Sequence, residues 1–155
     1  MKIYRTVSMI KLSQRGFSLL EVLISLAVLS VGLLGLAALQ TVGLRINHDS
    51  YQRTQATIMA YDIADRMRAN SAGLTAGRYV VLVSTNPTGL DCIASACTPD
   101  QLADYDVRTW HEMLALKLSN GQGAISAPSA AGTRTITITW LENDLPMQLK
   151  VDVQI

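Results

Sequence analysis

Hydrophobic positions are most concentrated near the start of the chain, where residues 17–39 are almost all apolar or small. As an α-helix at 1.5 Å per residue this run is about 34 Å long, enough to cross a membrane core of about 30 Å. Its polar members are Ser18, Glu21, Ser25 and Ser30. The pattern therefore predicts a membrane-spanning helix with one carboxylate just inside its beginning.

After Leu39 the pattern stays helical but becomes amphipathic. Apolar residues recur at spacings of three and four, with charged residues on the other faces. The apolar set is Ala56, Met59, Ala60, Ile63, Ala64 and Met67. One continuous helix is predicted from about Phe17 to Asn70, and the segment Asn70 to Gly73 is predicted to end it. We expect the apolar stripe to hold this helix against a folded head.

Two further elements are predicted before the last third of the chain. Residues 78–85 (RYVVLVST) predict one strand, followed by a turn-rich stretch and a loop. A second helix is predicted from Pro99 to near residues 119–123, with Thr98 as its N-cap. Its apolar positions are Leu102, Tyr105, Trp110, Met113, Leu114 and Leu116.

The last third alternates between apolar and polar residues, which is typical of β-strands. In residues 133–141 the apolar positions are Ile136, Ile138 and Trp140, and in residues 147–155 they are Met147, Leu149, Val151, Val153 and Ile155. The connecting residues 142–146 resemble a turn, so an antiparallel hairpin is predicted. The predicted fold class is α+β, with a long N-terminal helix packed on a small antiparallel sheet.

Charge predicts how the chain is oriented. Lys2, Arg5, Lys11 and Arg15 precede the apolar run, and no acidic residue does. Because positive flanks stay cytoplasmic, the chain after Leu39 is expected across the membrane. Four of the 13 basic residues lie in this flank, which leaves nine against 12 acidic residues. The remainder thus has no basic excess for nucleic acid, and no nucleic-acid partner is expected.

Cys92 and Cys97 lie in the part that is placed outside the cytoplasm. Such a compartment permits disulfides, and a single C-x4-C pair lacks the second pair that a zinc site needs. A short disulfide is therefore favoured over a metal half-site. No metal and no other cofactor is predicted.

Three interpretations of the N-terminus compete. A secretory signal has an apolar core of about 7–15 residues and a small-residue cleavage site; residues 35–37 fit such a site, but the run before them is too long and contains Glu21. An ordinary transmembrane helix explains the length and the basic flank. It leaves Glu21 unexplained, although a carboxylate in a membrane usually has a function.

The third interpretation takes the whole motif. Gly16 followed by FSLLEVLISLAVL resembles the class III signal of type IV prepilins, in which a basic leader ends in glycine, phenylalanine follows and glutamate is the fifth residue after the cut. The resemblance implies that prepilin peptidase cleaves between Gly16 and Phe17 on the cytoplasmic side and that Phe17 is N-methylated. It implies a leader of residues 1–16, a membrane and assembly helix of residues 17–39, and a pilin-fold head of residues 40–155.

In that family Glu21 would be the glutamate used in assembly. A carboxylate near the membrane needs a cationic partner, and the new ammonium group on Phe17 of a neighbouring chain lies at a similar depth. Pairing within one chain and recognition by the assembly machinery are alternative roles. Small residues along the run would let helices approach closely; they are Ser25, Gly32, Gly35, Ala37 and Ala38.

One subgroup of the family fits best. A second helix with Asp104 or Asp106 and Trp110, a glycine-bearing break and a strand ending in TITWLEN resembles the minor pilins of the PilV type. This implies a low-abundance subunit of a Gram-negative inner membrane, with its head in the periplasm, that later reaches the pilus and cell surface. Implied partners are other minor pilins, the major pilin, the inner-membrane assembly platform, a tip adhesin and, before assembly, membrane lipid. The alternative is a minor pseudopilin of a type II secretion system, which has a very similar start.

No catalytic motif is complete. HEMLA at His111 matches only the first half of a zinc-protease pattern, since the second histidine would be Ala115. His48 and His111 are expected to be solvated or half-exposed. Asp104, Asp106 and Glu112 can in principle pair as acid and base, but acids on a helix more often form a solvated face. The sequence therefore predicts a structural subunit and no enzyme.

Overall fold

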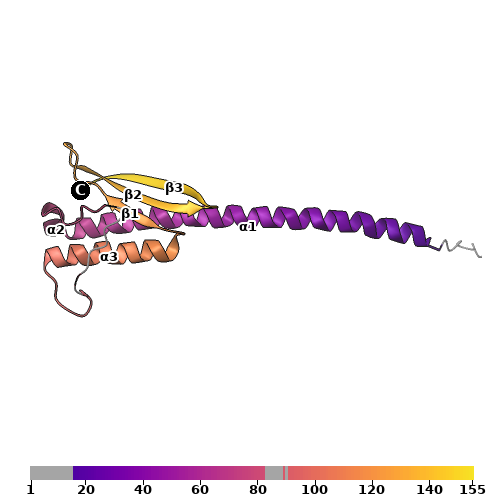
Figure 1. The fold of residues 1–155 in the computed structure, drawn as a ribbon, viewed down its shortest axis with the longest axis horizontal. Coiled ribbons are helices and arrows are strands. Elements are labelled where there is room, and N and C mark those ends of the chain that lie inside the picture. The colour runs from indigo at the N-terminus through magenta and orange to yellow at the C-terminus, as the bar shows by residue number, and fades with distance from the viewer. Residues whose placement is uncertain (1–15, 83–88, 90) are drawn as a thin grey trace, which may run out of the picture. The chain divides into compact units, whose positions relative to one another are not determined.

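The computed structural model describes residues 16–82, 89 and 91–155, and Figure 1 shows their fold. Its elements are α1 (Leu19–Ala69), α2 (Ser71–Thr75), α3 (Pro99–Lys117), β1 (Gln122–Ile125), β2 (Thr133–Glu142) and β3 (Leu145–Gln154). The chain divides into two compact units, Met1–Leu44 and Arg45–Ile155. The predicted leader lies outside the described residues except for Gly16.

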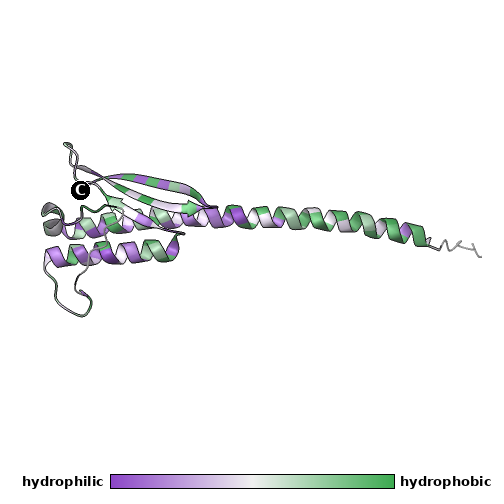
Figure 2. Ribbon diagram, in the orientation of Figure 1, coloured by the Kyte–Doolittle hydropathy of each residue, from purple (hydrophilic) through white to green (hydrophobic). Residues whose placement is uncertain are grey.

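The described part of the first unit is the N-terminal stretch of α1. Its large apolar side chains are exposed, from Phe17 and Leu19 to Leu44, and Figure 2 shows the hydrophobic residues along it. By length and composition α1 contains a segment able to cross a membrane. Because α1 runs from Leu19 to Ala69, the predicted helix from about Phe17 to Asn70 is confirmed to within two residues at each end.

The core of the second unit joins α1, α3 and the sheet. All six residues of the predicted stripe on α1 are buried, and they form one cluster with Trp110 and with the sheet residues Ile136 and Ile138. Trp110 is 1% exposed, and its indole Nε1 donates a hydrogen bond to the carbonyl oxygen of Met59 at 3.0 Å. A Cβ atom on Gly123 would lie 2.3 Å from the Trp110 ring. Close packing of α3 on β1 therefore requires glycine at position 123.

The second helix begins as predicted. Thr98 is its N-cap and forms a capping box with Gln101, in which each side chain accepts a hydrogen bond from the backbone N–H of the other residue. The helix ends at Lys117, just before the predicted residues 119–123. Its buried residues are Ala103, Asp106, Val107, Trp110 and Leu114, whereas Leu102, Met113 and Leu116 are exposed.

The C-terminal hairpin is confirmed. β2 and β3 pair antiparallel without interruption from Thr133↔Gln154 to Glu142↔Leu145. Asn143 and Asp144 connect them with φ angles of 54° and 63°, which is the conformation of a two-residue type I′ turn. Sheet order is β1-β2-β3. The apolar side of β2 is buried, and most of that of β3 is half-buried.

Three parts of the fold differ from the sequence prediction. β1 was not predicted. α2 was not predicted either: Asn70 ends α1 as predicted, and it also caps α2 by accepting a hydrogen bond from the N–H of Gly73. In the predicted strand 78–85, Tyr79 lies in a turn and Val81 forms a single bridge with Ile125, while residues 83–85 lie outside the described residues. The turn contains Gly77, whose φ of 75° suits glycine.

Tyr79 belongs to a buried polar cluster that joins the end of α1 to α3. Its hydroxyl donates a hydrogen bond of 2.6 Å to Asp106 and accepts one from the side-chain amide of Asn70. Arg66 on α1 contacts the other carboxylate oxygen of Asp106 at 3.4 Å. The buried carboxylate thus has two donors, which offsets the cost of removing it from water.

This cluster predicts a loss of stability at high pH. Burial raises the pKa of the Tyr79 hydroxyl well above its usual range, and the hydrogen bond to Asp106 raises it further. An unfolded tyrosine titrates near pH 10. The stability that the neutral, buried Tyr79 hydroxyl contributes to the fold is therefore present below about pH 10 and is lost as the pH rises further. We expect the free energy of unfolding to fall above about pH 10, and Tyr79→Phe to flatten that fall. Denaturant titrations across this range measure it.

The control for that prediction is Tyr61→Phe. Tyr61 is 53% exposed on α1, so its removal should leave the slope of stability against pH unchanged. Equal slopes in the Tyr79→Phe variant and the native chain would contradict the prediction.

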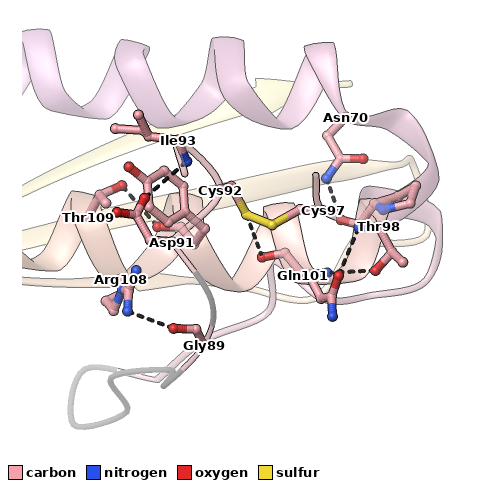
Figure 3. The surroundings of a disulfide bond; sticks show 12 residues. Asn70, Gly89, Asp91, Cys92, Ile93, Cys97, Thr98, Gln101, Arg108 and Thr109 are labelled. Carbon is pink, nitrogen blue, oxygen red and sulfur yellow. Dashed lines mark hydrogen bonds between the residues drawn. A yellow bond between two sulfur atoms is a disulfide. The ribbon is translucent and has the colours of Figure 1, made fainter. Parts of the chain in front are cut away.

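The cysteine pair is a disulfide, as predicted. Cys92 and Cys97 are joined, with their Cα atoms 5.5 Å apart, and the loop lies just before the N-cap of α3 (Figure 3). Asp91 accepts a hydrogen bond from the N–H of Ile93 at the start of this loop. The disulfide therefore closes a local loop against the first turn of α3.

Candidate functional site

The predicted cleavage and assembly residues lie at the start of α1. Gly16 and Phe17 precede the helix, and Phe17 is 82% exposed. The Ser18 hydroxyl accepts a hydrogen bond from the N–H of Leu20, and its carbonyl accepts from the N–H of Glu21. Ser18 thus satisfies backbone donors that a helix start leaves free, and it sets where α1 begins, two residues after Phe17.

Gly16 is not required by the fold of the described residues. A Cβ atom added at this position would have no heavy atom within 4 Å, and its φ angle is not in the left-handed region. A Cβ atom added at Gly32, Gly35 or Gly43 on α1 would also have no heavy atom within 4 Å. Glycine inside a helix nevertheless costs about 1 kcal/mol relative to alanine. The α1 surface at these glycines is therefore open enough for another helix to approach it closely.

Glu21 lies in the first turn of α1, where the positive end of the helix dipole favours a negative charge. It borders a shallow apolar groove, whose other residues are Phe17, Val22, Ser25, Leu26 and Leu29. Within the part of the chain that the structure describes, no cation forms an ion pair with Glu21. The carboxylate is thus exposed on an apolar helix with its charge uncompensated by those residues.

Other polar groups of the apolar segment are satisfied locally. The Ser25 hydroxyl donates to the carbonyl oxygen of Glu21, and that of Ser30 donates to the carbonyl oxygen of Leu26, each at 2.7 Å. Such internal bonds let serine enter an apolar medium without losing a hydrogen-bond partner. Glu21 is therefore the polar residue of residues 17–39 whose side chain has most to gain from an external partner.

Asp104 and Asp106 on α3 have separate partners. Asp106 is buried and contacts Tyr79 and Arg66, and Asp104 forms an ion pair with Arg78. Glu112 is exposed. The geometry gives Asp104 and Asp106 structural roles, and it does not assemble the three carboxylates as an acid and base pair.

The histidines match their predicted exposure. The side chain of His48 is 66% exposed, with Nδ1 3.7 Å from a carboxylate oxygen of Asp49. His111 is half-buried, and its ring centre lies 5.2 Å from that of Trp110. Among residues 16–82, 89 and 91–155, no three histidine, cysteine, aspartate or glutamate side chains gather to hold a metal ion.

Most arginines of the head lie beside acids or carbonyls. Ion pairs join Arg53 to Glu142, Arg66 to Asp62 and Asp106, Arg68 to Asp65, and Arg78 to Asp104. Arg108 donates to the carbonyl oxygen of Gly89 (Figure 3), and Arg134 is buried and donates to backbone carbonyls. These side chains are distributed over several elements and do not make a single basic surface.

Sequence reasoning missed the contacts that join α1 to the hairpin turn. Arg53 forms two hydrogen bonds to the carboxylate of Glu142, and the side-chain amide of Asn143 donates to Asp49 at 3.3 Å. The partners lie 89 and 94 residues apart in the chain. No local pattern connects residues at such separations, so only the fold reveals them.

Comparison with known proteins gives two matches, which together run from residue 11 to residue 108. Residues 11–37 match the family model of the prokaryotic N-terminal methylation motif, and this range contains Gly16, Phe17 and Glu21. Residues 38–108 match the family model of type IV pilin Tt1218, from the apolar part of α1 into α3. No curated protein and no solved structure matches the chain.

Proposed function

We propose that this type IV pilin-like protein, which carries the prepilin N-terminal methylation motif, is a minor subunit of a type IV pilus. The observation that carries the proposal is the coincidence of that motif with an exposed apolar helix whose first turn holds Glu21. A subunit that builds a fibre needs both features. The proposal includes no catalytic activity of its own.

The proposed processing acts at Gly16 and Phe17. Prepilin peptidase removes residues 1–16 and Phe17 is methylated, which leaves residues 17–39 as a membrane helix and residues 40–155 as the periplasmic head. The exposure of Phe17 and the open space around Gly16 support access by an enzyme. A bulky residue at position 16 would meet no obstacle within the described chain, so any selection of glycine there comes from that enzyme.

In the proposed assembly, the apolar half of α1 exchanges contact with lipid for contact with neighbouring helices. Gly32, Gly35 and Gly43 are open positions at which another helix can approach closely. Glu21 pairs with the terminal ammonium group of Phe17 on a neighbouring chain. Desolvation opposes this pairing and the low dielectric strengthens it, so the pair acts mainly to select the correct stagger between subunits.

The proposed partners follow from these roles. They are prepilin peptidase, the inner-membrane assembly platform, the major pilin and other minor pilins, with a tip adhesin presented at the end of the fibre. The head, with its buried core and its many surface ion pairs, supplies the contacts that choose neighbours. A pseudopilus of type II secretion would use the same chemistry, and recovery of the chain in sheared pili separates the two.

The intact mass of the chain recovered from membranes tests the processing. We expect a mass that lacks residues 1–16 and includes one methyl group, because the motif directs the cut after Gly16. Gly16→Val should leave the leader attached, whereas Gly43→Val, which also meets open space, should be cleaved normally. A native chain with its leader intact, or one cut near Ala37, would contradict the proposal.

A further inference from the structure

β3 (Leu145–Gln154) is the last strand of the sheet, and no strand that the structure describes pairs with its outer edge. Its pairing with β2 is regular over ten residues and contains no bulge. A long, regular edge with unpaired backbone groups is a template for another strand. As far as the described residues reach, the sheet is therefore open to a further strand on this side.

The free backbone groups belong to the even-numbered residues of β3. In β2 the odd-numbered residues bond toward β1, since Leu141 N–H donates to the Ser119 carbonyl and Thr135 accepts from Ser126 N–H. The even-numbered residues of β2 therefore bond β3, where their partners in the register are odd-numbered. N–H and C=O groups are thus left on the outer edge by Gln148, Lys150, Asp152 and Gln154.

The position of proline agrees with this assignment. Pro146 is even-numbered, so its missing N–H falls on the outer edge, where a proline is tolerated in a strand. On the side that faces the core, Met147, Leu149 and Val151 are only half-buried. An added strand would cover these apolar side chains as well as bond the backbone.

We propose that a second copy of this chain occupies the edge, by antiparallel pairing of β3 with β3 around a two-fold axis at Val151. In this register Lys150 faces Asp152 of the second copy, and by symmetry the same pair forms twice. Both residues direct backbone groups outward, so they form hydrogen-bonded pairs of the antiparallel type. Opposite charges on directly opposed residues are favourable, whereas like charges are not.

The remaining pairs in this register are also self-complementary. Gln148 faces Gln154, and Leu149 faces Val153 on the side of the core, with Val151 facing its own copy. A shift of one residue would place apolar side chains on the polar side of the neighbouring sheet. The charges and the alternation of β3 thus favour the same register.

The two-fold axis also fixes the relative direction of the two heads. Glu142 at one end of β2 pairs with Arg53, and Arg134 at the other end donates to the carbonyl of Leu74, so β2 runs against α1 and β3 runs with it (Figure 1). Antiparallel β3 strands therefore set the head segments of α1 antiparallel. If the proposed function holds, subunits of one fibre all point the same way, so this contact joins heads of different fibres or facing membranes.

Cysteine crosslinking of the full chain in detergent micelles tests the pairing, and it does not depend on the proposed function. Directly opposed Cβ atoms lie about 4.5–5.5 Å apart, so Val151→Cys should give a disulfide-linked dimer on mild oxidation. Leu149→Cys is the matched control, because its two copies would be four positions apart along the strand, or about 13 Å. Absence of a dimer for Val151→Cys, or equal crosslinking of both variants, would overturn the proposal.

Charge exchange tests the register in the Val151→Cys background. Lys150→Asp alone or Asp152→Lys alone opposes like charges at both symmetric positions, and each should lower crosslinking about tenfold. The combined Lys150→Asp and Asp152→Lys variant restores opposite charges and should restore crosslinking. Both side chains are exposed, so these changes should leave the core of the head intact. Single variants that crosslink as well as the parent would refute self-pairing in this register, as would failure of the combined variant to recover.

Discussion

Replacing Trp110 with alanine is expected to lower the free energy of unfolding of the head by about 3–5 kcal/mol. The indole is 1% exposed, packs on Gly123 and donates a hydrogen bond to Met59 of α1. Alanine would leave a cavity at the junction of α1, α3 and β1. Since a domain of this size has a total stability of about 5–15 kcal/mol, this loss is a large fraction of it. Denaturant unfolding, followed by the fluorescence of Trp140, measures it.

A double-mutant cycle separates the contact with Gly123 from the other effects. Gly123→Val should also destabilise the head, because its Cβ would lie 2.3 Å from the Trp110 ring. With Trp110→Ala in the same chain, valine has space in the cavity, so the combined loss should be smaller than the sum of the single losses. Trp110→Phe keeps most of the ring and removes the hydrogen bond, so its cost should be lower. Additive losses for Trp110→Ala and Gly123→Val would contradict the described packing.

The elements that the sequence predicted best are those set by local chemistry. The N-cap of α3 was predicted from Thr98 and Pro99, and the structure has Thr98 as the N-cap with Pro99 as the first residue of the helix. The β2–β3 hairpin follows from strict alternation around a two-residue turn at Asn143 and Asp144. Such signals lie within a few residues of each other, so no knowledge of the rest of the fold is needed.

The elements that were missed depend on contacts between distant residues. β1 contains Gly123 and Ala124, which have low strand propensity, and it forms because β2 supplies its hydrogen bonds and Trp110 packs on it. Asp106 had the pattern of an exposed acid on a helix. It is buried because Tyr79 and Arg66, 27 and 40 residues away, supply donors to its carboxylate.

The candidate site is predictable for the same local reason. Gly16, Phe17 and Glu21 fall within six consecutive residues, and their spacing, together with the basic leader and the apolar run, is enough to identify the motif. Among the residues that the structure describes, none forms an ion pair with the Glu21 carboxylate. The role of this carboxylate therefore has to be tested in the assembled state.

Replacing Glu21 with alanine is expected to lower incorporation into sheared fibres about tenfold or more. In the proposed assembly Glu21 belongs to a desolvated charge pair, and truncating one member of such a pair costs several kcal/mol. Cleavage of the leader and membrane insertion should continue, since the apolar run is unchanged. Glu21→Gln keeps the shape and removes the charge, so it should fail to a similar degree. Ser25→Ala, which borders the same groove and loses only a local hydrogen bond, should be incorporated normally. Immunodetection of sheared and membrane fractions gives the ratio.

The stage at which the variant fails distinguishes pairing between subunits from recognition by the assembly machinery. If Glu21 pairs with the terminal ammonium group of a neighbour, the Glu21→Ala chain should still bind the assembly platform and be lost only when it must dock on the fibre. If the platform itself reads the carboxylate, binding to the platform should fall with incorporation. Normal incorporation of Glu21→Gln would refute both roles, because neither a cationic partner nor a charge-reading platform tolerates loss of the negative charge.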